Sequence, residues 1–419
     1  MTAERLLVAV TAFAVHPPRR GGQARPAGLL ANLGPGWRVE HYAQSFQRTD
    51  LPWPAERRDV TPRWTEHNLR DPVSTAWHAL AGRLGYPPVG ADRLLGLLPR
   101  RAVRSALRRA DAVYTSHPYQ VPWVRAATPD ATPVVLDSPN VETEVYTAAG
   151  SGMERRLTAA VGRAERRAWS LVDLALTSTV EDATVLLAGG VPRVAVVPNG
   201  ADVEAVHPAT GAERAAARRE LGLPGDGILA VFVGSAHPPN VEAVRLLEDA
   251  APSLRGAGVV VAVVGRAGTG RNPVPGVVHA GEVPAVAPWL AAADIALCPL
   301  LSGGGSSLKV AEYLAAGLPL VTTPVGARGF DLTDGWDALV REPADLPSAV
   351  ADLAGDPAGR RLLGAAARAH AEERLGWASA GRAMAAAIGE LLERPGAGDQ
   401  TAAAASSAPR TDSAQDRHV

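Results

Sequence analysis

A glycine- and serine-rich turn within residues 294–326 has the composition of a phosphate-binding site. A β-branched run precedes the turn, and a helix that should stop at Gly317 follows it. The residues of the turn are Gly303, Gly304, Gly305, Ser306 and Ser307. Glycines let a ligand approach the backbone, either serine is a natural N-cap, and a helix N-terminus supplies free N–H groups. The pattern predicts an anion site suited to phosphate, with a plain β–α turn as the alternative.

Two charged side chains follow this turn at helical spacing. Lys309, the only lysine among 42 basic residues, falls in the first helical turn, where it can add a full charge beside a phosphate. Glu312 lies one turn further along the same face, in a position suited to a sugar hydroxyl. Leu308 stands where a Walker loop has glycine, which excludes that motif. The spacing favours a nucleotide sugar, and a surface Lys–Glu pair is the alternative.

Further candidates follow the first strands of the chain. Gly21 and Gly22 come after the apolar run 6–14 and open a helix that contains Arg25. His117 ends the run 111–116, at the edge where open α/β sheets bind ligands. The run 133–138 is followed by a second polar group, formed by Asp137, Asn140 and Glu142. A simple turn for the glycines and a structural role for the histidine are the alternatives.

The elements that must position these residues alternate along the chain. The runs predicted to be buried parallel strands are 6–14, 111–116, 133–138, 172–178, 193–198, 228–234, 259–265, 294–300 and 319–323. The amphipathic segments between and after them are 92–109, 152–170, 179–188, 240–250, 308–316 and 358–373. This alternation predicts an α/β fold with helices on both faces of each sheet. The number of strands favours two doubly wound domains.

The chain also shows where its domains should begin and end. A boundary is predicted at 188–205, which contains the turn dipeptide Asn199–Gly200. Residues 395–419 are Ala/Ser-rich without apolar periodicity, which predicts a disordered tail. The proline- and tryptophan-rich segment 50–90 is expected to be irregular with one helix.

Composition and charge exclude several classes of protein. The 419 residues are 47 % hydrophobic and 20 % charged, as in a globular chain. A net charge of −1 offers no basic field for nucleic acid, and the single cysteine, Cys298, excludes a disulfide framework. No clustered metal ligands are visible, so no metal or cofactor is expected. The apolar runs are too short to span a bilayer and the N-terminal run carries Glu4, so a cytoplasmic protein is expected.

The stretch GGGSSLKVAEYLAAGLPLVTTPVGARG (303–329) resembles the donor-binding signature of retaining glycosyltransferases of the GT-B fold, of the family 4 type. Further segments resemble the family in the expected order, over about residues 5–393. They are HPPRRGGQARPAGLLANL (16–33), DAVYTSHPY (111–119), VVLDSPNVET (134–143), VVPNGADVEAVHP (196–208) and VFVGSAHPPNVEAV (231–244).

The resemblance implies a fold and an activity. Two Rossmann-like domains would face a cleft, with the acceptor on 1–190 and the nucleotide sugar on 199–375, and a helix at 378–393 would return to the first domain. The enzyme would transfer a sugar from a nucleotide-diphosphate sugar to a hydroxyl, with retention and without metal. The acceptor would be a polysaccharide, a lipid-linked molecule or a small glycoside, as in the synthesis of cell-envelope polysaccharide.

The resemblance also implies roles for individual residues. His117 would contact the transferred sugar, Lys309 the leaving diphosphate and Glu312 the ribose. The other donor-binding residues would be Gly21, Gly22, Gly234, Ser235, Glu282, Gly304, Gly305, Ser306, Ser307 and Leu308. The acceptor side would comprise Arg25, Asp137, Asn140 and Glu142, the last of which is also placed to cap the following helix.

The chain departs from the family pattern at two places. Gly304 stands where many members have the first of two signature glutamates, and GSAHPPN (234–240) lacks the basic pair that often binds the diphosphate. The groups left to neutralise the diphosphate are the loop amides, Lys309, Arg19, Arg20 and Arg25. These departures keep two other functions open, a non-catalytic nucleotide-sugar-binding partner subunit and a GT-B nucleotide-sugar epimerase.

Arginine-rich helical stretches at 94–110 and 153–169 suit an anionic bilayer surface. They would fit peripheral contact with the inner membrane face and a lipid-linked acceptor. A solvated outer face on an arginine-biased protein is the alternative.

Overall fold

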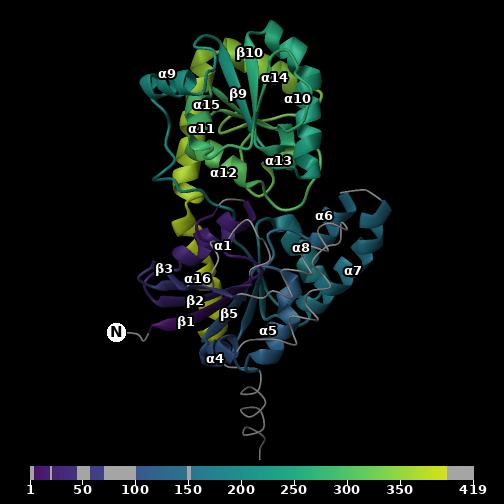
Figure 1. The fold of residues 1–419 in the computed structure, drawn as a ribbon, viewed down its shortest axis with the longest axis vertical. Helices are drawn as coiled ribbons and strands as arrows, with labels where there is room; N and C mark the ends of the chain where they lie inside the picture. The colour runs from purple at the N-terminus through teal and green to yellow at the C-terminus, as the bar shows by residue number, and fades with distance from the viewer. Residues whose placement is uncertain (1–3, 19–20, 45–56, 70–100, 149–151, 394–419) are drawn as a thin grey trace, which may run out of the picture.

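The computed structural model describes residues 4–18, 21–44, 57–69, 101–148 and 152–393. They form two α/β domains placed one above the other along the long axis of the molecule (Figure 1). The first contains an eight-stranded sheet in the order β3-β4-β2-β1-β5-β6-β7-β8, and the second a six-stranded sheet in the order β11-β10-β9-β12-β13-β14. Every pairing is parallel except that between β3 and β4.

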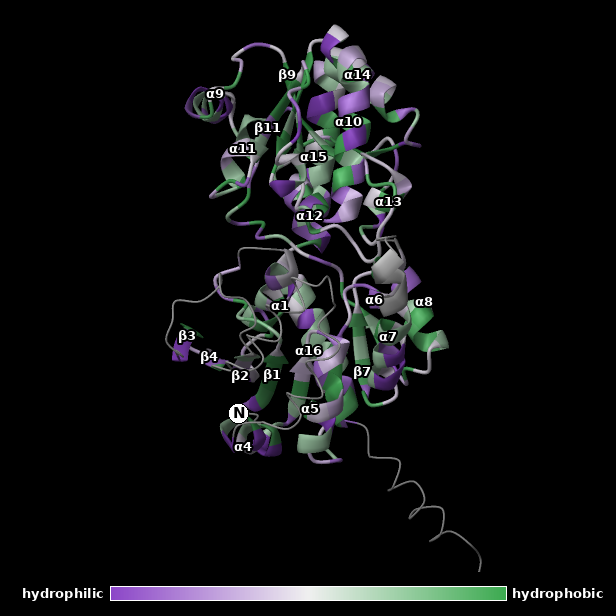
Figure 2. Cartoon of the chain, turned by 45° about the vertical axis from the view of Figure 1, so that its right-hand side comes forward, coloured by the Kyte–Doolittle hydropathy of each residue, from purple (hydrophilic) through white to green (hydrophobic). Residues whose placement is uncertain are grey.

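The first sheet consists of β1 (Arg5–Thr11), β2 (Trp37–Gln44), β3 (Arg57–Thr61), β4 (Trp64–Leu69), β5 (Ala112–Thr115), β6 (Val134–Asp137), β7 (Leu174–Thr177) and β8 (Val194–Val196). Its central strands are buried on both faces, because helices cover both. Along β1, Val8 and Val10 enter one core, whereas Leu7 and Ala9 enter the other. This two-sided burial explains the continuous apolar runs in the sequence, and Figure 2 shows β1 and β7 as hydrophobic strands.

Helices from distant parts of the chain form the two layers on this sheet. One core includes residues of α4 (Arg101–Arg109), α5 (Val121–Ala127), α7 (Gly152–Trp169) and α8 (Val180–Ala188). The other includes α1 (Gly21–Ala31) and α16 (Trp377–Glu393), so the last described helix returns to the first domain (Figure 1). Gly28 of α1 leaves room for the Trp377 ring, and the backbone at Gly381 lies against Asn32.

The second sheet consists of β9 (Ile228–Val233), β10 (Val259–Val264), β11 (Val277–Gly281), β12 (Ile295–Cys298), β13 (Leu320–Thr322) and β14 (Leu339–Val340). Its helices are α9 (Gly211–Glu220), α10 (Pro238–Gly256), α11 (Ala287–Ala292), α12 (Leu308–Ala315), α13 (Pro324–Ala327), α14 (Leu346–Gly355) and α15 (Pro357–Arg374). Their apolar side chains form one continuous core with the sheet.

Each sheet reverses its strand order once, which creates a crevice at the carboxyl ends of the strands. In the first sheet β1 lies between β2 and β5, and in the second β9 lies between β10 and β12. Ligands of open α/β sheets bind at such positions. The loop 303–306 after β12 contacts residues after β6 and β7, so the two carboxyl edges face each other.

The structure differs from the sequence predictions in several segments. Each of the nine predicted strands is present, but β2, β3, β4, β11 and β14 were missed. Residues 57–69 form the β3–β4 hairpin, so the prediction of irregular structure with one helix is wrong for this part of 50–90. The first sheet extends to β8, past the expected limit at 190. The tail 395–419 and residues 92–100 lie outside the described residues. None of the helices in the described ranges is long and apolar enough to cross a membrane.

Candidate functional site

The N-terminus of α12 carries an uncommitted set of backbone donors. Ser307 is its N-cap, with extended backbone, but its side chain makes no capping hydrogen bond. The N–H groups without a hydrogen-bond partner among the described residues are those of Gly304, Gly305, Ser307, Leu308 and Lys309. Free donors at the positive end of a helix form an anion site. These N–H groups can therefore donate hydrogen bonds to phosphate oxygens.

Ser306 differs from its neighbours in this loop. Its N–H donates to Ser178 Oγ at 3.1 Å, so the expectation that this amide is free for phosphate is wrong. Its Oγ and carbonyl oxygen accept from Asn199 Nδ2 at 2.9 and 3.1 Å. Arg328 Nη1 donates to the Gly303 carbonyl at 3.1 Å, so the loop is held at both ends.

The Lys309 ammonium contacts a side-chain amide and an aromatic ring. Its Nζ donates to Asn240 Oδ1 at 2.7 Å and lies 4.8 Å from the centre of the Phe232 ring. Burial lowers the pKa of Lys309, while an anionic ligand would raise it again. The Glu312 carboxyl makes no hydrogen bond to the described residues, and burial raises its pKa. Because Lys309 bonds Asn240 rather than Glu312, the alternative of a surface ion pair does not fit.

The loop after β9 completes the second-domain half of the site. Asn240 Nδ2 donates to Ser235 Oγ at 3.2 Å, so this amide joins Ser235 to Lys309. A Cβ at Gly234 would come within 2.8 Å of the Phe232 ring, which shows how closely this loop packs. Sequence reasoning missed Asn240, although it lies in the GSAHPPN segment and begins a helix beside the expected phosphate.

The glycine loop of the first domain reaches this half of the site. A Cβ at Gly21 would lie 3.1 Å from Leu308 Cδ1, and one at Gly22 would lie 3.7 Å from the Phe13 ring. Phe13 in turn makes an edge contact with His117, with ring centres 5.6 Å apart. The structure thus brings Gly21, Gly22 and His117 to the side of the interface that faces Leu308.

His117 is partly exposed at the end of β5. Its Nδ1 lies 3.0 Å from Ser116 Oγ, which fixes the ring orientation. Burial lowers the pKa of His117 to about 4, so its imidazole is neutral near pH 7. A neutral ring can donate one hydrogen bond and accept another.

Asn140 and Glu142 lie across the interface from the glycine-rich turn. A Cβ at Gly304 would be 3.6 Å from Asn140 Cβ, an ordinary contact. Burial and the nearby Glu165 raise the pKa of Glu142 to about 7. The expected capping role of Glu142 is wrong, because Glu165 accepts the N–H groups of Glu142 and Thr143 at 2.7 and 2.8 Å.

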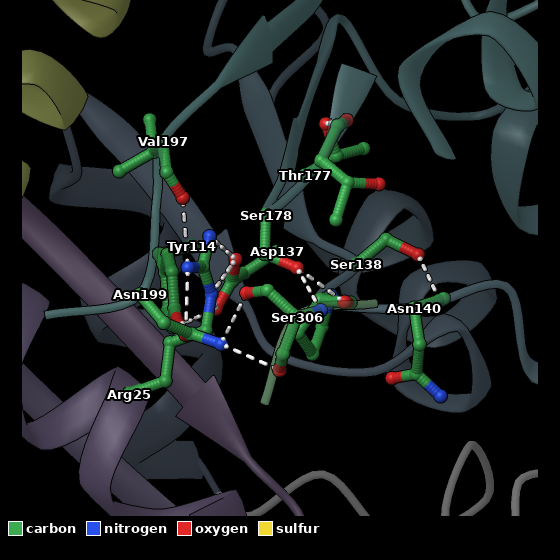
Figure 3. Close-up of polar contacts among 12 residues, drawn as sticks. Arg25, Tyr114, Asp137, Ser138, Asn140, Thr177, Ser178, Val197, Asn199 and Ser306 are labelled. Atoms are coloured by element: carbon green, nitrogen blue, oxygen red, sulfur yellow. Dashed lines mark hydrogen bonds and ion pairs between the residues drawn. The ribbon is translucent and has the colours of Figure 1, made fainter. Parts of the chain in front are cut away.

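Arg25 and Asp137 do not line an acceptor pocket, which corrects the sequence expectation. Their side chains are 2 % and 1 % exposed, and Arg25 Nε and Nη2 both lie 2.9 Å from Asp137 Oδ1 (Figure 3). Tyr114 donates its hydroxyl to the same carboxylate at 2.8 Å. The Arg25 guanidinium is thus committed to a buried pair, and it is not free to meet a diphosphate.

The remaining candidates are not brought into contact with this set of residues. Glu282 is exposed after β11, an edge strand of the second sheet. Arg19 and Arg20 lie outside the described residues. Within the described ranges, no three His, Cys, Asp or Glu side chains are grouped as a metal site would require.

Comparison with known proteins connects this geometry to a family. Residues 227–356 match the family model described as Glycosyl transferases group 1. The chain is 34 % identical to D-inositol 3-phosphate glycosyltransferase of Thermomonospora curvata over 234 residues, which are 49 % of this chain and 54 % of that protein. The enzyme of the same name from Streptomyces scabiei is 33 % identical over 46 % of this chain and 48 % of its own length. The chain thus spans about half the length of these relatives.

Solved structures resemble most of this chain. Sucrose-phosphate synthase from Thermosynechococcus elongatus matches with a TM-score of 0.66 and 17 % identity, over 96 % of this chain and 100 % of its own. WaaG, a glycosyltransferase involved in lipopolysaccharide biosynthesis, matches with a TM-score of 0.60 and 16 % identity, over 91 % of this chain and 99 % of its own. Anabaena HepE in complex with UDP and glucose matches with a TM-score of 0.63 and 14 % identity, over 91 % of this chain and 99 % of its own. These likenesses establish the GT-B fold.

Proposed function

We propose that this chain, which has the GT-B fold and carries a Glycosyl transferases group 1 domain at residues 227–356, is a glycosyltransferase. It would move a sugar from a nucleotide-diphosphate sugar to a hydroxyl acceptor, with retention and without metal. The observation that carries the proposal is the set of free N–H groups at the start of α12, beside Lys309 and facing the first domain.

The proposed reaction needs charge stabilisation on the leaving group. The bond from the anomeric carbon to the diphosphate oxygen breaks, and the acceptor oxygen bonds that carbon. The acceptor proton leaves with the diphosphate, so charge and atoms balance. Negative charge grows on the diphosphate as the bond breaks, where Lys309 and the loop amides can meet it. The support for retention is the resemblance of the 303–329 signature.

The charge and the free hydrogen-bonding groups of His117 and Glu312 indicate their proposed roles. Neutral His117 would orient sugar hydroxyls through hydrogen bonds rather than carry charge. Glu312 has unpaired carboxylate oxygens one turn after Lys309 and would accept from the ribose hydroxyls. Of the four predicted acceptor-side residues, Arg25 and Asp137 are committed to a buried pair. Asn140 and Glu142 therefore remain as the candidates to contact the acceptor.

A ligand panel followed by a transfer assay tests this proposal. Thermal shift with UDP, GDP, ADP and their sugars should identify one base. Release of the nucleoside diphosphate from the matching sugar should then be measured with water, with inositol 3-phosphate and with lipid-linked and glycoside acceptors. Inositol 3-phosphate is included because the relatives carry it in their names. If no nucleotide sugar raises the melting temperature and none is consumed, the proposal is wrong.

A second candidate is a nucleotide-sugar-binding subunit without activity. It is favoured by Gly304, which stands where many members of the family have a glutamate. Binding of a nucleotide sugar with no release of nucleoside diphosphate in any acceptor condition would support this candidate over the enzyme.

A further inference from the structure

We infer that Asn199 is a positioning residue for donor binding, because it holds the Ser306 hydroxyl as a hydrogen-bond donor toward the phosphates. The inference rests on the proposed function. It concerns a chain of buried polar contacts that begins at Asp137 in the first domain and ends at the phosphate-binding loop of the second (Figure 3).

The first link is the Arg25 guanidinium. Nε and Nη2 are directed at Asp137, while Nη1 donates to the Val197 carbonyl at 2.8 Å and to Asn199 Oδ1 at 3.1 Å. Nε and Nη1 donate hydrogen bonds, Nη2 lies at ion-pair distance from Asp137 without a hydrogen bond, and the side chain is 2 % exposed. The charge is compensated by Asp137, and its remaining donors point at the segment that joins the two domains.

The second link is the Asn199 amide, whose orientation is fixed from both sides. Arginine has only donors, so the atom that faces Arg25 must be the amide oxygen. The Ser306 carbonyl has only acceptor sites, so the atom that faces it must be the amide nitrogen. Asn199 is 3 % exposed. The amide therefore cannot turn over without breaking contacts at both ends.

The third link determines what the Ser306 hydroxyl can do. Its Oγ accepts from Asn199 Nδ2 at 2.9 Å, so its proton must point elsewhere. No described residue accepts that proton, and Ser306 is only partly buried. The hydroxyl lies in the loop whose neighbouring N–H groups are free. A diphosphate oxygen bound at this loop is the acceptor that completes the series of hydrogen bonds.

The first domain also fixes the loop from a second direction. Ser178 Oγ accepts the Ser306 N–H at 3.1 Å and donates to the Pro139 carbonyl at 2.7 Å. Ser306 is thus held through its amide, its carbonyl and its hydroxyl by residues outside the second domain. The loop would adopt its phosphate-binding shape when the two domains are arranged as in this structure.

Calorimetry with inorganic pyrophosphate and with UDP tests this inference. Asn199→Asp keeps the shape of the side chain but has no N–H to donate, and Asn199→Ala removes it. Each should weaken pyrophosphate binding by about 3- to 10-fold, the worth of one hydrogen bond. Ser306→Ala should have a similar effect. In the double variant that combines Asn199→Asp with Ser306→Ala, the Kd for pyrophosphate should be at most about twofold higher than in either single variant. The two losses should not add, because both residues act through one hydroxyl.

A matched control and a fold check separate positioning from general destabilisation. Asn32→Ala removes another asparagine, whose Nδ2 donates to the Gly28 carbonyl at 2.8 Å, and should leave the Kd within about twofold. Melting temperatures of all variants are measured alongside. A merely structural role would lower the melting temperature of Asn199→Asp without this non-additive loss of affinity.

The possible results separate the two claims. If the parent protein binds neither pyrophosphate nor UDP, the proposed donor site is wrong and the inference falls with it. If the parent binds and the Asn199 variants bind equally well, the positioning role is overturned while the donor site stands. Equal and non-additive losses for Asn199 and Ser306 support the inference.

Discussion

Lys309 is the residue on which the donor site depends most directly. Its ammonium is held by an uncharged amide and an aromatic face, and no carboxylate of the described residues forms an ion pair with it, although Glu312 acts on it electrostatically. A charge held in this way remains available to a ligand that carries negative charge.

Lys309→Ala should lower kcat and the affinity for the nucleotide sugar. Loss of one charge-assisted contact in a sheltered site corresponds to about 2–4 kcal/mol, or roughly 30- to 1000-fold in rate. Lys309→Arg should recover part of the loss, because it keeps the charge but is too large and planar for this pocket. Steady-state kinetics measures both effects. Unchanged turnover in Lys309→Ala would remove the phosphate role of this residue.

His117 contributes through a neutral ring, which leads to a pH-dependent prediction. Its folded pKa of about 4 is below the ordinary 6.5, so the folded protein binds this proton less readily than the unfolded chain. Its stabilising contribution is complete above pH 6.5 and is lost as the pH falls toward 4. As the pH falls from 6.5 to 4, the free energy of unfolding should therefore decrease by about 1–3 kcal/mol less in His117→Asn than in the parent protein. Urea unfolding at several pH values measures the difference, and equal slopes would contradict the burial of a neutral ring.

At the scale of elements, the turn between β12 and α12 combines an exposed function with close packing. Gly305 has a φ of 67°, which favours glycine, and its Cα faces the Pro139 carbonyl too closely for a side chain. The N–H groups beside it stay free, because the turn is held by Ser306 and Gly303 instead. Packing against the first domain therefore shapes the turn and occupies the Ser306 N–H, while the neighbouring N–H groups stay free.

Gly305→Ala should disrupt donor binding more than it disrupts folding. The left-handed backbone costs about 1–2 kcal/mol for alanine, and the contact with Pro139 must open as well. We expect the Kd for UDP to rise by at least about tenfold, because the free N–H groups lose their alignment. Gly211→Ala is the matched control, since it has ordinary φ and open space around it. Equal UDP affinity in both variants would show that the turn does not depend on this packing.

At the scale of the whole molecule, α16 adds a C-terminal segment of the sequence, Trp377–Glu393, to the core of the first domain. Met384 and Ile388 are fully buried in the core that contains Leu7 and Ala9 of β1. The chain therefore crosses between the domains twice, near Asn199 and again before Trp377. Two crossings restrict the motions by which the domains can separate.

Met384→Ala should destabilise the first domain although it lies near the end of the described chain. Truncation of a buried methionine costs about 2–5 kcal/mol, because it loses transfer energy and leaves a cavity. Thermal unfolding should show this loss, and Glu393→Ala on the exposed end of the same helix should not. If the two substitutions have equal effects, α16 does not form part of that core in solution.

Activity should survive chelation of divalent metals. In the proposed site, Lys309 and the loop amides would supply the positive charge that a metal would otherwise bring to the diphosphate. Treatment with EDTA should leave the rate within about a factor of two. A loss of two orders of magnitude that manganese restores would place a metal at the diphosphate.

The sequence by itself determined the local structure and the residue types of the proposed donor site. The central strands and the helix after the glycine turn were predictable, because continuous apolar runs and 3.6-residue periodicity are local signals. Lys309 and Glu312 were recognisable from their spacing after the turn. The strand β2 was missed although Trp37, Val39 and His41 are buried at alternate positions, since its charged residues obscured the pattern.

Only the tertiary structure decided how these groups are connected. Arg25 and Asp137 resembled ligand-binding residues, but the fold buries them in one pair, and Asn240 became the partner of Lys309 only when α10 met α12. Asn199 and Ser306 lie 107 positions apart, and Ser178 and Ser306 lie 128 apart. No local pattern records such contacts, because they depend on how two complete sheets face each other. The sequence thus encoded a glycine-rich turn that we propose binds phosphate, and the meeting of the two domains determined which of its N–H donors remain free.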